Sequence, residues 1–299
     1  MPNCSPFAAP AACLALCFSC LAAGTAPTEV LHFRDDDIEE SSGLAVLPGR
    51  ERLFLTHNDS GDSARVFLVD TSGKTVTTIA LEKADAVDWE DLALGARDSA
   101  GMPEVLVGDI GDNDEVRPQV QIYRFALPAD AGRSKRSRVR ARKYQFTYPD
   151  RPRNAESLLV NPTSGQILIV TKSLLGSEFF VAPNPPVEGR PNRLRLVGKV
   201  QFPQLLKQLG KPTRSLGSAL ATGGAISPDG KRLVLRTYTD AFEWRIPADG
   251  LAGIGRVLPR WIEVPDVAMG ESITYSPAGD RCYTSAEGKH SPVHELVLR

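Results

Sequence analysis

From residue 28 onward, apolar residues occur in short runs that are separated by turns rich in Pro, Gly, Asp and Ser. Runs of this length without a long helical period predict β-strands. Segment 203–209 is amphipathic and predicts one short helical turn within a loop. A chain made of many short strands folds as a sandwich, a barrel or a propeller, so the predicted fold class is all-β.

An internal repeat favours the propeller. Four apolar runs end in a turn proline, and each is followed by Gly and a second apolar run: 43–48, 157–162, 223–228 and 272–277. A fifth unit begins at Asp91 and has a longer turn. Five such units predict a single β-propeller of five four-stranded blades over residues 29–299, with strand 29–33 closing the ring as the missing outer strand of the last blade. Six blades are the alternative, if the long third unit forms two.

The first 24 residues differ from the rest. Residues 8–24 carry no charge and end in small residues, which predicts a signal peptide over 1–24 rather than a membrane span. Four of the five cysteines lie in this leader, so Cys282 alone remains and the mature chain has no internal disulfide. We expect a secreted or periplasmic protein with no transmembrane segment after signal removal. A lipoprotein anchored at Cys20 is the less favoured alternative.

The charge balance limits the kinds of partner. With 35 basic and 36 acidic residues, the net charge of −1 provides no bulk attraction to nucleic acid. We therefore expect a monomer that recognises a small-molecule or glycan ligand through a local patch. The basic run 133–143 alternates as a single exposed outer strand would.

Polar residues gather at one mouth of the predicted channel. Six residues before each turn proline, or at the matching place in the second unit, stands a side chain with an oxygen: Ser42, Glu90, Glu156, Thr222 and Glu271. The second strand of each unit is antiparallel to the first, so it ends at the same mouth. Oxygen ligands without His or Cys pairs favour Ca²⁺, with Mg²⁺ less favoured. The predicted metal ligands are Asp59, Asp62, Glu90, Asp91, Asp109, Asp112, Glu156, Glu271 and Glu287. The alternative is that Asn, Asp and Gly here simply form tight turns.

The same mouth contains candidate catalytic and substrate-binding groups. The predicted acids and bases are His57, Glu90, Glu156 and Glu271. The residues predicted to contact substrate are Trp89, Lys172, Arg236 and Tyr238. Lys172 and Arg236 either neutralise the glutamates or hold an anionic substrate that a metal also bridges.

Several motifs together resemble those of a group of uncharacterised secreted bacterial β-propeller proteins. They include NDSGD at 58–62, DWED at 88–91, GDIGDN at 108–113 and GESI at 270–273. The resemblance covers nearly all of the mature chain and implies the propeller fold and an important mouth, but no reaction. Calcium-dependent propellers of the phytase-like and apyrase groups and five-bladed glycosidases are similar at the level of the fold only.

Three functions stay open at this point, and whether the protein is an enzyme is one of the open questions. The favoured hypothesis is a metal-assisted hydrolase that acts on a phosphate- or carboxylate-bearing substrate. The alternatives are a non-catalytic propeller that binds a ligand or polymer, and a metal-free glycosidase-type hydrolase that uses two of the glutamates.

Overall fold

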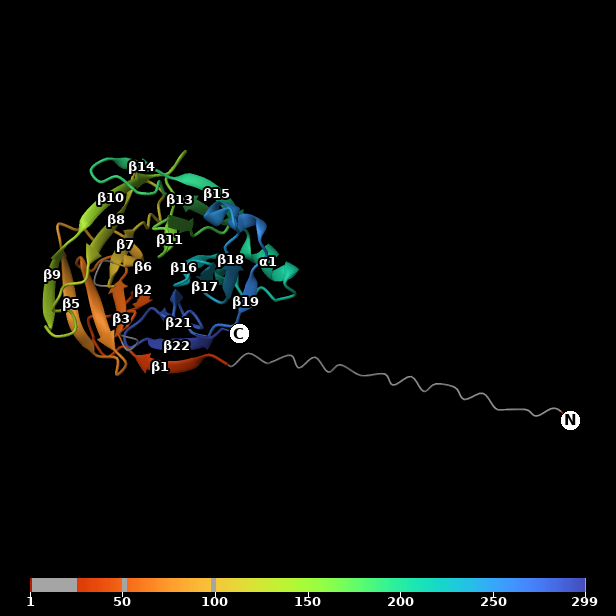
Figure 1. The fold of residues 1–299 in the computed structure, drawn as a ribbon, viewed down its shortest axis with the longest axis horizontal. Helices are drawn as coiled ribbons and strands as arrows, with labels where there is room; N and C mark the ends of the chain where they lie inside the picture. The colour runs from red at the N-terminus through yellow and green to blue at the C-terminus, as the bar shows by residue number, and fades with distance from the viewer. Residues whose placement is uncertain (2–25, 50–52, 98–100, 299) are drawn as a thin grey trace.

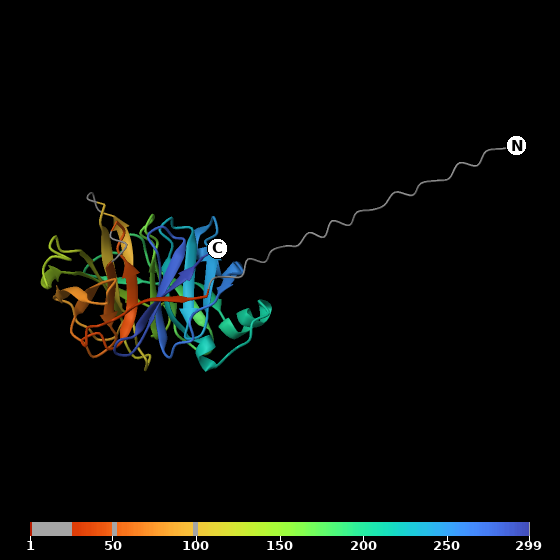
Figure 2. The same ribbon diagram turned by 90° about the horizontal axis from the view of Figure 1, so that it is seen from below.

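Five sheets stand around a common axis in the computed structural model, which describes residues 1, 26–49, 53–97 and 101–298 (Figure 1). Seen from the side, the connecting loops lie on the two faces of the disc (Figure 2). The protein is thus a five-bladed β-propeller, as the repeat predicts, and the six-bladed alternative is wrong. The predicted signal peptide, apart from Met1, lies outside the described residues.

Each blade is numbered in chain order and written from its innermost strand outward. Blade 1 has β2 (Ser41–Val46), β3 (Leu53–Asn58), β4 (Arg65–Asp70) and β5 (Thr75–Glu82). Blade 2 has β6 (Trp89–Arg97), β7 (Pro103–Asp109), β8 (Val120–Ala126) and β10 (Arg142–Thr147). Blade 3 has β11 (Ala155–Val160), β12 (Ile167–Thr171), β13 (Ser177–Val181) and β15 (Arg195–Val200).

The last two blades follow the same plan. Blade 4 has β16 (Ala221–Ile226), β17 (Arg232–Thr237), β18 (Ala241–Arg245) and β19 (Arg260–Ile262). Blade 5 has β20 (Gly270–Tyr275), β21 (Arg281–Ala286), β22 (Pro292–Val297) and, outermost, β1 (Thr28–His32). Strand β1 pairs antiparallel with β22, so the N-terminal strand closes the ring as predicted. Closure covers an edge that would otherwise be free to pair with another chain.

Two blades carry a fifth strand that comes from the following unit of the chain. Strand β9 (Arg136–Arg140) pairs in parallel with β5, and β14 (Pro191–Arg193) pairs in parallel with β10. The basic run 133–143 is therefore not one outer strand: β9 extends blade 1, whereas β10, which starts two residues after β9 ends, is the fourth strand of blade 2. Each added strand links two neighbouring blades by backbone hydrogen bonds.

The core consists of five apolar layers, each between two adjacent blades. For example, Leu68 of β4 packs with Val107 of β7, and Phe179 of β13 packs in one cluster with Trp244 of β18. Cys282 lies fully buried in the layer between blades 4 and 5.

Among the described residues, helices occur only in connections between strands. The helix α1 (Phe202–Gln208), expected from the amphipathic segment, covers the layer between blades 3 and 4. Two 3₁₀ helices, η1 (Leu216–Ala219) and η2 (Gly250–Arg256), complete the described elements. Within the described part of the chain, no helix has the length and apolar character needed to span a membrane.

Candidate functional site

All five innermost strands begin at the same mouth of the channel, and each is irregular at its second residue. The pairing register shifts across this residue in every blade, which is the mark of a β-bulge. The five second residues are all buried: Ser42, Glu90, Glu156, Thr222 and Glu271. A bulge re-aims a side chain out of the regular alternation, so the fold presents these oxygens at the mouth.

Two of the five oxygens are used within the wall. The Ser42 hydroxyl donates a hydrogen bond to the carbonyl of Glu90, on the next inner strand. The Thr222 hydroxyl lies 2.9 Å from the carbonyl oxygen of Glu271, again on the next inner strand. These hydroxyls tie neighbouring blades together, which leaves three glutamates to shape the chemistry of the mouth.

Three carboxylates lie together between blades 1 and 2, and we call them the acidic trio: Asp59, Asp88 and Glu90. One oxygen from each lies within 4.8 Å of one oxygen from each of the other two. Gly111, directly after β7, lies against them, because a Cβ at this position would be 2.1 Å from Glu90 Oε1 and 2.4 Å from Asp88 Oδ2. Only glycine lets the chain pass so close to two carboxylates.

The acidic trio holds its protons more tightly than free carboxylates do. Burial raises the pKa of Asp59 to about 7, and the charges of Glu156 and Asp88 add to this rise. Burial and the neighbouring Glu156 also raise the pKa of Glu90 well above its ordinary value. The pKa of Asp88 is raised too, mainly by burial, although Arg117 opposes the shift. Such a group is stabilised either by shared protons or by a bound cation.

Glu156 faces a basic partner instead. Lys172 Nζ, just after β12, lies 3.0 Å from Glu156 Oε1 and donates a 2.8 Å hydrogen bond to the Tyr238 hydroxyl. Burial alone would lower the pKa of Lys172, but the charge of Glu156 and the bond to Tyr238 raise it above its ordinary value. Burial raises the pKa of Tyr238 to about 12, so its hydroxyl keeps its proton.

Glu271 has the least satisfied side chain of the mouth. Its residue is 2% exposed, and neither carboxyl oxygen has a hydrogen-bond partner. Burial, together with the charge of Glu156 and the adjacent Glu287, raises its pKa well above the ordinary value. A buried carboxyl in this state keeps a proton near neutral pH or binds a cation.

Arg236 was predicted to contact substrate, and the structure places it fully inside the wall. Its guanidinium donates to the Thr284 hydroxyl and to the carbonyl of Thr237, 3.1 Å away. Burial lowers its pKa to about 10, although the charge of Glu271 opposes the shift. Arg236 therefore fixes backbone beneath the mouth.

His57 and Trp89 lie in the layer between blades 1 and 2. His57 is 0% exposed, its Nδ1 lies 2.7 Å from the Asn58 carbonyl, and its ring meets Trp89 edge-on at 5.6 Å. Burial lowers its pKa to about 4. Trp89 is 1% exposed and donates its indole N–H to the Asp85 carbonyl. Neither ring has a free face for a substrate, so both act by packing.

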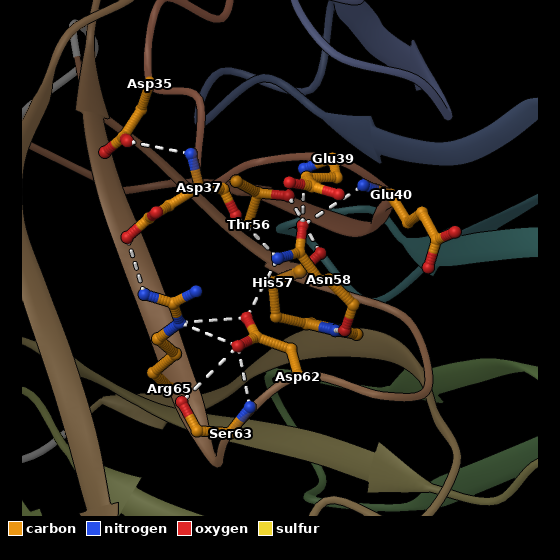
Figure 3. A network of polar contacts seen from close by, with 10 residues as sticks. All are labelled: Asp35, Asp37, Glu39, Glu40, Thr56, His57, Asn58, Asp62, Ser63 and Arg65. Atoms are coloured by element: carbon orange, nitrogen blue, oxygen red, sulfur yellow. Dashed lines mark hydrogen bonds and ion pairs between the residues drawn. The ribbon is translucent and has the colours of Figure 1, made fainter.

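Four predicted metal ligands are occupied by other partners. Asp62 pairs with Arg65 at 2.9 Å and accepts a bond from Asn58, as Figure 3 shows. Asp109 pairs with Arg117 at 2.7 Å, whereas Asp112 accepts hydrogen bonds from the backbone of its own turn.

The fourth of these, Asp91, lies deeper in the channel. It accepts hydrogen bonds from the amides of Leu92 and Leu158, at 2.8 and 2.9 Å. Sequence analysis did not propose Asp88 as a ligand, although its place in the DWED motif, one residue before an inner strand, was a usable signal.

No family model matches the chain, and no curated protein matches it. Among solved structures, it is similar to a gluconolactonase from Xanthomonas campestris, with 14% identity, a TM-score of 0.48 and coverage of 87% of this chain and 72% of that one. It is also similar to the β-propeller domain of Cps50 (Swd1) from Myceliophteria thermophila, with 11% identity, a TM-score of 0.45 and coverage of 91% and 100%. Function is therefore argued from the residues of the mouth.

Proposed function

We propose that the acidic trio binds a divalent cation, Ca²⁺ in preference to Mg²⁺, in an exported protein. The observation that carries this proposal is the close approach of Asp59, Asp88 and Glu90 within 4.8 Å of one another. Carboxylate oxygens are the ligands that Ca²⁺ prefers, and its flexible coordination suits side chains from two blades better than the strict octahedron of Mg²⁺ does. Burial raises the pKa of each member of the trio, and a bound cation would offset the cost of burying their negative charges.

We further propose that the mouth is the active site of a metal-assisted hydrolase for a phosphate- or carboxylate-bearing substrate. The cation would supply Lewis-acid polarisation of a substrate oxygen. Lys172, held by Glu156 and Tyr238, places one positive charge beside the trio and attracts an anionic group. Burial raises the pKa of Glu271, which suits this carboxyl to donate a proton to a leaving group.

The test is thermal unfolding of the metal-stripped mature protein, titrated with Ca²⁺ and then with Mg²⁺. Ligand that binds only the folded state raises stability by mass action. We expect a saturable rise with Ca²⁺ that Glu90→Gln abolishes, whereas the exposed Glu188→Gln leaves it unchanged. Release of phosphate from aryl phosphate esters, assayed with and without Ca²⁺, then tests the hydrolase. Stabilisation without turnover would leave a cation-binding module, and no stabilisation by either ion would refute the metal site.

A further inference from the structure

The opposite mouth of the channel contains a cavity of about 340 Å³. Every innermost strand contributes a residue to its wall, namely Val46, Leu94, Val160, Ile226 and Tyr275. The turn prolines of four blades surround its entrance: Pro48, Pro162, Pro228 and Pro277. A concave, mainly aliphatic cavity of this size is typical of a site for a small apolar ligand.

This cavity is separate from the acidic mouth. Its wall includes Leu92 and Gly224 but none of the acidic trio. Between the two compartments lies the buried Asp91, whose carboxylate accepts hydrogen bonds from the amides of Leu92 and Leu158. This hydrogen bond ties the neighbouring inner strands β6 and β11 together within the wall. Because the cavity and the acidic trio share no lining residue, a ligand in this cavity would not depend on the cation site.

One charged side chain lines the cavity, among the residues that the structure describes there. Arg97, at the end of β6, is exposed, and its guanidinium makes a 3.3 Å hydrogen bond to the carbonyl of Gly101. Its positive charge at the rim of an aliphatic cavity is complementary to an amphiphile with a negative head.

We propose that this cavity binds an aliphatic carboxylate. The hydrocarbon chain lies against the partly exposed Leu94 and Ala225, and the carboxylate pairs with Arg97. Burial of the chain supplies most of the affinity, because the aliphatic surfaces on both sides leave water. Arg97 supplies the selectivity, since a neutral or cationic head gains nothing from the guanidinium. The proposal is independent of the function proposed for the acidic mouth.

The experiment is calorimetric titration of the full mature protein with octanoate, octanol and octylamine. We expect binding in the order octanoate, octanol, octylamine. Arg97→Gln should weaken octanoate about tenfold or more and leave octanol unchanged. Arg97→Glu should make octylamine the preferred ligand. The matched control is Arg195→Gln on the exposed face of β15, which should bind octanoate as the wild type does.

A second variant tests the apolar half of the site. Ala225 lines the cavity and is half-buried, so Ala225→Phe fills part of the space and should weaken octanoate and octanol together. Thermal unfolding of each variant checks that it is folded. The proposal is overturned if octanoate does not bind the wild type, or if Arg97→Gln and Arg97→Glu keep the wild-type order of ligands.

Discussion

Asp59 and Asp62 lie three residues apart in one loop, yet their environments shift their pKa values in opposite directions. Burial raises the pKa of Asp59 from 3.8 to about 7. For Asp62 burial acts the same way, but the hydrogen bonds from Arg65, Ser63 and Asn58 together outweigh it and bring the pKa below 3.8. We therefore predict that Asp59→Asn stabilises the metal-free protein near neutral pH, whereas Asp62→Asn destabilises it.

The Asp59 effect arises mainly from burial, and the neighbouring carboxylates add to it. Two unit charges 4.8 Å apart repel each other by about 3.5 kcal/mol at an effective dielectric constant of about 20. The rise in pKa from 3.8 to about 7 corresponds independently to about 4 kcal/mol. Because Asp59 is partly exposed, screening reduces the expected gain in unfolding free energy on Asp59→Asn to about 2 kcal/mol.

The raised pKa of Asp59 makes the stability of the fold depend on pH. The folded protein binds the Asp59 proton more tightly than the unfolded chain, so this group stabilises the fold below pH 3.8 and that contribution is lost as the pH rises to about 7. The unfolding free energies of the wild-type and Asp59→Asn proteins should thus be similar in acid and should diverge as the pH rises toward neutral. For Asp62 the contribution is present above pH 3.8 and is lost as the pH falls below it.

The assay is chemical denaturation of metal-free protein at several pH values, repeated with excess Ca²⁺. At about one hundred times its dissociation constant, Ca²⁺ should add about 2.7 kcal/mol to the wild type and markedly less to Asp59→Asn. Asp62→Asn should keep the Ca²⁺ response in spite of its lower stability. The reasoning is refuted if Asp59→Asn and wild type have parallel stability profiles between about pH 4 and 8, or gain equally from Ca²⁺.

Three further outcomes are expected. Gly111→Ala should abolish Ca²⁺ stabilisation in a folded protein, because its Cβ would displace the carboxylates of the trio. Gly255→Ala is the control, since its Cβ would meet only ordinary contacts from 3.5 Å outward, and it should keep the stabilisation. Calorimetry compares the effect of Ca²⁺ on the unfolding of the two variants. Lys172→Met should lower the unfolding free energy by about 3–5 kcal/mol at neutral pH, since it leaves Glu156 buried without its basic partner. A smaller loss of unfolding free energy, measured by chemical denaturation, would contradict a stabilising Lys172–Glu156 pair. His57→Gln should reduce stability but leave the pH profile of any hydrolysis unchanged, because burial already lowers the imidazole pKa to about 4.

The sequence predicts the blades because each blade repeats a local turn, and the residues that form such a turn can be recognised in a single sequence. It also predicts the oxygen at the second position of every inner strand. It does not predict which oxygens remain available, since this depends on contacts between blades. Ser42 and Thr222 donate to carbonyls of the next blade, and Arg236 turns into the wall. The sequence does not predict the pairing of β9 with blade 1 for the same reason, because its partner β5 lies 58 residues earlier in the chain.

The two ends of the channel differ because each inner strand that begins with a glutamate reaches an apolar or aromatic residue four positions later. Glu90 is followed by Leu94, Glu156 by Val160 and Glu271 by Tyr275 on the same strand. In a propeller all inner strands point the same way around the axis, so these local changes add up to one acidic mouth and one apolar mouth. The acidic mouth repels an anion unless a cation is bound, whereas the apolar mouth offers Arg97 at all times. A carboxylate ligand should therefore bind the apolar mouth with or without Ca²⁺, and the acidic mouth only when Ca²⁺ is bound.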